Sequence, residues 1–133
     1  MEIFSSEITG SPPIKHTANS YVDIPGLSLT IPSAVAYKDN DALIILNVPM
    51  SYAEGNNFPG IQFSILVNGL LVAEGAFSYE TKQPDSPGRM PFTLVKSIKL
   101  IKDQETGVKA QWMFPRKSVM VIDSLASISA IVA

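Results

Sequence analysis

The sequence lacks several features on which whole classes of function depend. It contains no cysteine, so disulfide bonds and thiolate metal sites are excluded. Its one histidine, His16, lies in a proline-containing segment, whereas a Ser-His-Asp triad requires a base that is held by a rigid scaffold. A zinc site needs three or four ligands, and no second histidine is available. We therefore expect a protein that is not an enzyme and that uses no metal and no cofactor.

Charge is also scarce. Ten Lys and Arg against twelve Asp and Glu give a net charge of -2, and charged residues make up 17% of the 133 residues. In a typical globular domain, roughly a quarter of the residues are charged. The basic residues are scattered, so the sequence offers no basic stripe for nucleic acid and we expect no such partner. Because hydrophobic residues make up 46%, we expect a partner to cover some apolar surface.

Long apolar runs are absent too. No stretch approaches the ~18 apolar residues of a membrane-spanning helix. The segment 1–7 lacks the basic start and unbroken apolar run of a secretory signal. We therefore predict no membrane insertion. The lack of cysteine suits a reducing cytoplasm but is common elsewhere, so the localisation stays open.

A strong β-hairpin signal lies near the middle of the chain. Asn68-Gly69 separates the β-patterned runs 62–67 and 70–77, and both turn residues accept the positive φ that a type I′ turn requires. Strand-like runs recur about every 8–12 residues with Gly and Pro between them, and no amphipathic helix is evident. The pattern predicts an all-β, antiparallel sandwich or barrel of eight to ten strands.

The strand-like runs also predict the organisation of the chain. They span residues 21–24, 27–31, 33–37, 42–48, 61–67, 70–79, 91–101, 108–114 and 119–133, with polar loops at 49–59 and 80–90. Residues 1–19 read as an N-terminal arm, and residues 20–133 as a single β-sandwich domain. A helix over 125–132 is an alternative, but three β-branched residues and two serines favour a strand there.

The last run is apolar on one face and partly apolar on the other. Leu125, Ser127, Ser129 and Ile131 alternate with Ala126, Ile128, Ala130 and Val132. Such a strand either lies centrally within one subunit, or it buries one face in the core and the other against a second subunit. For the second case we predict an oligomer interface that contains Leu125, Ile128, Ala130 and Val132.

Aromatic residues in the loops point to ligand binding. Tyr52 and Phe58 occupy the loop 49–59, where flat rings are free to stack on sugar faces while Asn56 and Asn57 bond hydroxyl groups. In the second loop, Arg89 would attract an anionic group.

Other polar and aromatic residues are weaker candidates. Asp85 would bond sugar hydroxyls, and Tyr79 is a further aromatic ring that a sugar site would use. If their loops meet, Arg116 and Lys117 would attract an anionic group together with Arg89, but such residues more often keep a surface soluble. Trp112 alternates with apolar neighbours, so a position in the core is favoured for it.

Asp39 and Asp41 form the one carboxylate pattern suited to a cation. Alternate carboxylates in a turn can converge on Ca²⁺. The segment lacks the Gly and the bidentate Glu of an EF-hand loop, and such residues commonly bond their own backbone. A turn is therefore favoured, with cation binding as the alternative.

Four segments follow one another in a characteristic order. They are a Pro-Gly strand that ends in Asn-Gly (59–69), a Leu-rich strand (94–100), a Gly-led strand with Trp112 (107–112) and a closing strand of small and apolar residues (127–131). In this order they resemble the globular head of the C1q and tumour necrosis factor superfamily over about residues 20–132. The resemblance implies a ten-stranded jelly roll that assembles as a trimer around a three-fold axis.

Two functions are favoured at this stage, and a small hydrolase with His16 as its base is the third and least supported alternative. The first is a non-enzymatic, oligomeric, C1q/TNF-like binding or assembly module, a homotrimer whose loops contact a protein ligand. The alternative is a carbohydrate-binding lectin on the same β-sandwich, with a glycan as its partner.

Overall fold

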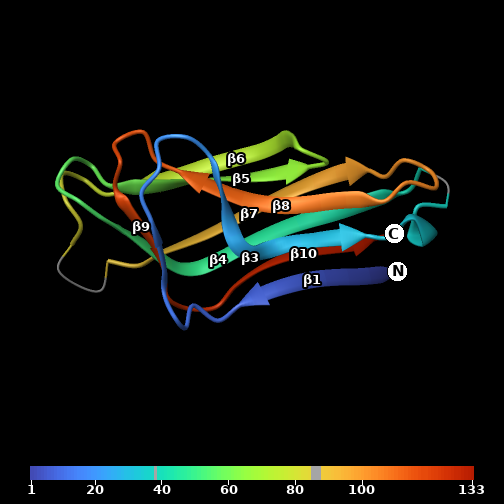
Figure 1. Cartoon of the computed structure of the whole chain (residues 1–133), viewed down its shortest axis with the longest axis horizontal. Coiled ribbons are helices and arrows are strands. Elements are labelled where there is room, and N and C mark those ends of the chain that lie inside the picture. Colours follow the sequence, from blue (N-terminus) through green and yellow to red (C-terminus); the bar gives the residue numbers. More distant parts are fainter. Residues whose placement is uncertain (38, 85–87) are drawn as a thin grey trace.

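The structure is a computed structural model, and it describes residues 1–37, 39–84 and 88–133. Within these ranges the chain forms ten β-strands and one short 3-10 helix, η1 (Ser33–Val35) (Figure 1). The strands are β1 (Glu2–Ile8), β2 (Ile14–His16), β3 (Val22–Ile31), β4 (Asp41–Glu54), β5 (Gly60–Val67), β6 (Leu70–Ser78), β7 (Met90–Lys99), β8 (Thr106–Met113), β9 (Val119–Ile122) and β10 (Ala126–Val132). No helix in the described ranges is long and apolar enough to cross a membrane.

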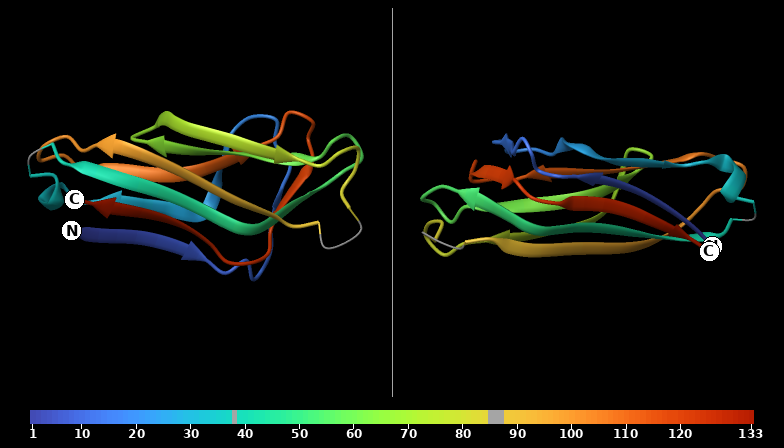
Figure 2. Two further views of the ribbon diagram at one scale, coloured as in Figure 1. Left: turned by 180° about the vertical axis from the view of Figure 1, so that it is seen from behind. Right: turned by 90° about the horizontal axis from the view of Figure 1, so that it is seen from below.

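The strands form two antiparallel sheets that pack face to face (Figure 2). The first sheet is built around β4, which pairs with β10 through residues 42–47, with β9 through residues 52–54 and with β7 through residues 41–51. In addition, β1 pairs with β10 and β2 pairs with β9. The second sheet has the order β3-β8-β5-β6. The predicted antiparallel all-β sandwich of eight to ten strands is confirmed.

The core lies between the two sheets and follows from period-2 alternation. Alternate residues of β4, β8 and β10 point inward and are buried, among them Ile44, Leu46, Val108, Ala110, Ile128 and Ala130. Trp112 on β8 is completely buried, so its predicted place in the core is confirmed. Each such large side chain contributes roughly 1.5–3 kcal/mol when it leaves water.

The predicted hairpin joins β5 to β6. Asn68 has φ 50° and Gly69 has φ 80°, so both residues adopt the positive φ that the turn requires. The turn is tied to the start of β8. The backbone N–H of Asn68 donates to the Gly107 carbonyl at 2.8 Å, and the Gly107 N–H donates to Asn68 Oδ1 at 2.8 Å.

Several strand boundaries differ from the sequence prediction. The predicted strand at 33–37 is wrong, because η1 follows Pro32 there. The predicted strands at 21–24 and 27–31 are one strand, β3, which bulges between Asp23 and Ser28 where Gly26 has φ 83°. The predicted loop at 49–59 begins too early. β4 continues to Glu54 because a register shift between Val48 and Ser51 accommodates Pro49, which cannot donate a backbone hydrogen bond.

The two ends of the chain enter the same sheet. The predicted arm, residues 1–19, contributes β1 and β2, and the predicted run at 119–133 divides into β9 and β10. At another margin of this sheet, β7 pairs with β4 and carries Pro91, Lys96 and Lys99.

Candidate functional site

Arg89 organises a polar cluster at the end of the sandwich where β6 and β9 end and β7 begins. The residue precedes β7, and its guanidinium reaches Asp123, which follows β9. Nη2 donates to Asp123 Oδ2 at 2.9 Å, and Nη1 donates both to Asp123 Oδ1 and, at 3.1 Å, to the Met50 carbonyl. A two-point pair of this kind fixes the plane of the guanidinium.

Two tyrosines complete this cluster. The Tyr52 ring, on β4, has its centroid 4.9 Å from Arg89 Cζ, which is within cation–π range. Tyr79, just after β6, donates its hydroxyl to the Gly88 carbonyl beside Arg89. We call Arg89, Asp123, Tyr52 and Tyr79 the Arg89 cluster.

The electrostatics keep both partners of the ion pair charged. The hydrogen bond from Arg89 holds the pKa of the Asp123 carboxyl below its usual value, and the same contact raises the pKa of Arg89. Burial raises the pKa of the Tyr79 hydroxyl, so this group stays a neutral donor. The side chains of Arg89 and Asp123 are 35% and 21% exposed, so a ligand can reach both.

A second aromatic and cationic pair is formed by Phe58 and Arg116. Arg116 Cζ lies 5.4 Å from the Phe58 ring centroid and 5.8 Å from that of Phe114. The Phe58 N–H donates to the Thr81 carbonyl at 2.8 Å, which connects the loop after β4 to the loop after β6. Asn56 and Asn57 are exposed in the same loop as Phe58.

The structure therefore divides the predicted ligand residues between two places. Tyr52 and Arg89 come together in the Arg89 cluster, whereas Phe58 pairs with Arg116. Tyr52 lies in β4 and not in a loop. Asp85 lies outside the described residues.

One member of the Arg89 cluster, Asp123, was missed from the sequence, whereas Tyr79 was predicted as an aromatic residue of a sugar site. Asp123 and Tyr79 are 34 and 10 positions from Arg89 in the chain, and only the fold brings them together. The Asp that follows a buried strand, Val119–Ile122, was the only available signal for Asp123.

The carboxylates of the acidic turn, Asp39 and Asp41, both bond to other residues of the same chain. Asp39 Oδ1 accepts the Lys102 backbone N–H at 2.7 Å, and Asp41 pairs with Lys99 at 2.9 Å. In the described part of the chain, no group of three or more His, Cys, Asp or Glu side chains could hold a metal ion.

The prediction of oligomer-interface residues needs correction. Ile128, Ala130 and Val132 point into the core of the single chain and are at most 2% exposed, so they offer no surface to a second subunit. Leu125 is 53% exposed. Both faces of β10 are rich in small or apolar residues, so the sequence pattern alone does not determine which of them turns inward.

The outward face of β10 belongs to a broad, weakly charged surface. Cross-strand register aligns it with outward residues of β1, β4 and β7. The rows are Ile3-Ile131-Leu43-Ser97, Ser5-Ser129-Ile45-Val95 and Glu7-Ser127-Asn47-Thr93, and we call these twelve residues the open face. Of the twelve, only Glu7 is charged, while Ile3 and Val95 are 62% and 52% exposed.

Several solved structures are similar to the chain at low sequence identity. Dimeric latent PorU from Porphyromonas gingivalis is 12% identical with a TM-score of 0.49, and the match covers 98% of this chain and 13% of that one. The EclA C-terminal domain, a sugar-binding protein, is 10% identical with a TM-score of 0.47 and coverages of 86% and 76%. Eiger TNF from S. frugiperda is 11% identical with a TM-score of 0.46 and coverages of 98% and 92%.

The comparison of sequences is more specific. No curated protein sequence matches the chain. Residues 11–131 match the family described as Bc2l-C, N-terminal domain.

Proposed function

Because the chain belongs to the family of the Bc2l-C N-terminal domain, we propose that it is a non-enzymatic lectin domain that binds a glycan at the Arg89 cluster. The observation that carries the proposal is the Arg89–Asp123 ion pair, which holds a guanidinium and a carboxylate side by side next to the Tyr52 ring.

The chemistry of the Arg89 cluster suits a sugar. Neighbouring hydroxyl groups on a pyranose need a donor and an acceptor placed next to each other, and the ion pair provides both. The described contacts use three of the five N–H donors of Arg89, which leaves two for a ligand. Tyr52 adds an apolar ring, which suits the C–H face of a pyranose.

A glycan array tests this proposal. The wild-type chain should bind at least one glycan, and Tyr52→Ala should abolish that binding while the circular dichroism spectrum remains that of a folded β-protein. Phe58→Ala is the matched control, since it removes an aromatic ring near Arg116 and leaves the Arg89 cluster intact. A wild-type chain that binds no glycan, or a Tyr52→Ala variant that binds normally, would contradict the proposal.

We also propose that the domain works as a C1q/TNF-like homotrimer that associates through the open face. The strand orders β1-β10-β4-β7 and β3-β8-β5-β6 support a jelly roll, because strands from the beginning and the end of the chain alternate in both sheets. The open face supports the contact itself, since a broad surface with one charge and several exposed apolar side chains is suited to a second copy.

Light scattering at micromolar concentration tests the association. We expect an oligomer for the wild type and a monomer for Ser129→Lys, which introduces a charge in the middle of the open face. Ser28→Lys is the matched control, because Ser28 is exposed on β3 in the other sheet. A monomeric wild type would contradict the proposal, and so would an oligomer that tolerates Ser129→Lys.

A further inference from the structure

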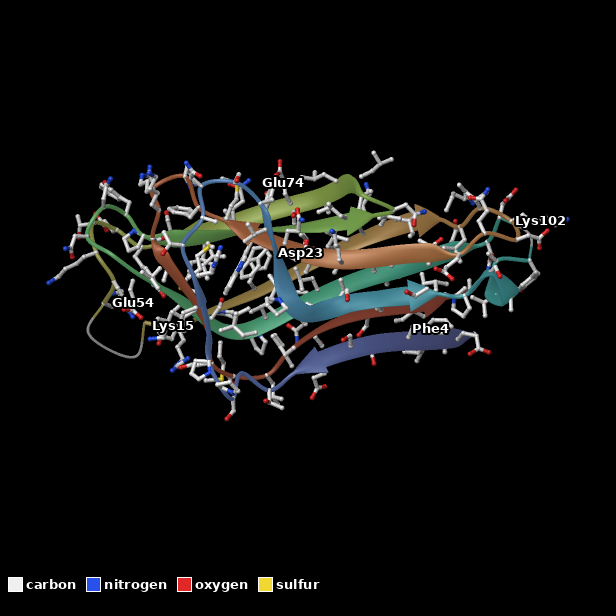
Figure 3. All side chains as sticks on the ribbon, in the orientation of Figure 1. Phe4, Lys15, Asp23, Glu54, Glu74 and Lys102 are labelled. Carbon is white, nitrogen blue, oxygen red and sulfur yellow. The ribbon has the colours of Figure 1, made fainter. Side chains whose placement is uncertain are left out.

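A second ion pair lies beside the Arg89 cluster. Lys15 Nζ, on β2, lies 3.8 Å from Glu54 Oε1, at the end of β4, and Figure 3 shows both residues at the same end of the sandwich. Val121 of β9 pairs with Lys15 on one side and with Tyr52 on the other. Lys15, Val121 and Tyr52 therefore form one row across three strands, and Glu54 shares the face of Tyr52 because side chains alternate along a strand.

This row points away from the core. Ala53 and Met120, which alternate with Tyr52 and Val121, pair with each other and are completely buried in the core. Period-2 alternation therefore turns Tyr52 and Val121 outward. The pKa of Asp123, lowered mainly by its hydrogen bond with Arg89, is lowered further by the charge of Lys15. Lys15 therefore lies close enough to the Arg89 cluster to act on it.

The polar groups of the Lys15–Glu54 pair are accessible and unused. The two side chains are 55% and 43% exposed, and 3.8 Å exceeds hydrogen-bond distance. Among the described residues, neither the ammonium nor the carboxylate takes part in a hydrogen bond. One ligand hydroxyl group is able to accept from the ammonium and donate to the carboxylate. An exposed ion pair of this kind contributes little to stability, so the fold does not depend on it.

The two ion pairs lie on either side of Tyr52 along β4. Arg89 donates to the carbonyl of Met50, two residues before Tyr52, and Glu54 follows two residues after it. From Met50 to Glu54 an extended strand spans about 13 Å, which exceeds the width of one pyranose ring. Each ion pair contains one positive and one negative charge, so the surface as a whole favours a neutral ligand.

We propose that the glycan bound at the Arg89 cluster is neutral and contains at least two sugar units, the second of which is held by Lys15 and Glu54. This inference rests on the proposed lectin function and extends it to the class of glycan. The terminal sugar bonds to Arg89 and Asp123 beside the Tyr52 ring. The second sugar places a hydroxyl group between the ammonium and the carboxylate, which makes Lys15 and Glu54 determinants of specificity.

Calorimetric titration with small sugars tests the second subsite. The probes are the methyl glycosides of glucose, galactose, mannose, fucose and N-acetylglucosamine, together with neutral disaccharides that end in the tightest-binding of these sugars. At least one such disaccharide should bind about fivefold or more tightly than the methyl glycoside, since about fivefold is the gain expected from one additional hydrogen bond.

Two variants assign this gain to the ion pair. Lys15→Met and Glu54→Gln should each lower the affinity for that disaccharide to nearly that of the methyl glycoside, and neither should change the affinity for the methyl glycoside itself. Lys99→Met is the matched control, because Lys99 belongs to an exposed ion pair at the other end of β4. This variant should bind both probes as the wild type does.

The outcomes separate the two proposals. A wild type that binds no glycan overturns glycan binding itself, and the second subsite with it. A wild type that binds the methyl glycoside as tightly as every disaccharide overturns the second subsite alone, and so does a preferred disaccharide whose affinity neither variant lowers. Binding restricted to acidic glycans overturns the neutral character of the ligand.

Discussion

Arg89 and Asp123 are 34 residues apart in the chain, yet they form a two-point ion pair with an Nη2 to Oδ2 distance of 2.9 Å. The same guanidinium lies 4.9 Å from the centre of the Tyr52 ring and donates to the Met50 carbonyl. One side chain thus joins the start of β7, the end of β9 and the distal part of β4. Four consequences can be measured, in this cluster and elsewhere in the fold.

The first prediction concerns binding and stability separately. Asp123→Asn keeps the shape of the side chain and removes its charge, so glycan affinity should fall at least about tenfold because a charge-assisted acceptor is lost. The free energy of unfolding should fall by only about 1 kcal/mol, since the pair is partly exposed. Calorimetric titration and urea unfolding measure the two effects.

Asp41→Asn is the control for Asp123→Asn. It removes an equivalent charge from the exposed Asp41–Lys99 pair, so it should leave glycan binding unchanged. Equal losses of affinity in the two variants would show that Asp123 has no specific role.

The second prediction follows from the lowered pKa of Asp123. Because the folded pKa is below the ordinary value of 3.8, the ion pair stabilises the protein above pH 3.8, and this stabilisation is lost as the pH falls through the lower folded pKa. The difference in urea midpoint between wild type and Asp123→Asn should therefore shrink below pH 3.8. A difference that stays constant down to pH 2 would refute this assignment.

The third prediction concerns Tyr21 at high pH. Its hydroxyl donates to Glu74 Oε2 at 2.6 Å, and burial together with this contact raises the pKa of Tyr21 from 10.0 to about 12. The raised folded pKa means that the contribution to stability is complete below pH 10 and declines between pH 10 and about 12.

Absorbance of ionised tyrosine at alkaline pH measures this titration. Tyr21→Phe should remove a component with a midpoint near pH 12. Because burial also raises the pKa of Tyr79, the assignment is wrong only if the amplitude of the late component is the same in Tyr21→Phe as in the wild type.

The fourth prediction uses two glycines. A Cβ at Gly60 would meet the Phe77 carbonyl and lie 2.8 Å from the Phe114 ring, so Gly60→Ala should lower the free energy of unfolding by roughly 3 kcal/mol through overpacking. A Cβ at Gly69 would have no atom of the described residues within 4 Å apart from its chain neighbours, so only the φ of +80° opposes alanine. Gly69→Ala should therefore cost about 1–2 kcal/mol. Chemical denaturation of both variants checks the order, and a reversed order would contradict it.

Local patterns were enough to predict much of the fold. The Asn68-Gly69 turn and the alternation that buries Trp112 depend on near neighbours in the sequence, so they could be predicted without knowledge of the partner strands. The continuation of β4 past Pro49 was missed, because the register shift that accommodates the proline depends on pairing with β7.

The candidate site was less accessible to prediction. Tyr52 and Arg89 were recognised as aromatic and cationic residues, but Asp123 becomes their neighbour only when β9 pairs with β4. The faces of β10 were also ambiguous, since the packing of the second sheet decides that Ile128 turns inward and Ser129 outward.

The margin formed by β7 bears on how concentrated solutions of the protein behave. Growth into a fibre needs unpaired backbone at a sheet edge that another strand can extend, and proline and lysine both discourage such addition. β7 carries Pro91, Lys96 and Lys99 along this edge. Concentrated solutions of the protein should therefore stay clear and bind little thioflavin, because strands of other copies do not add to the sheet at β7.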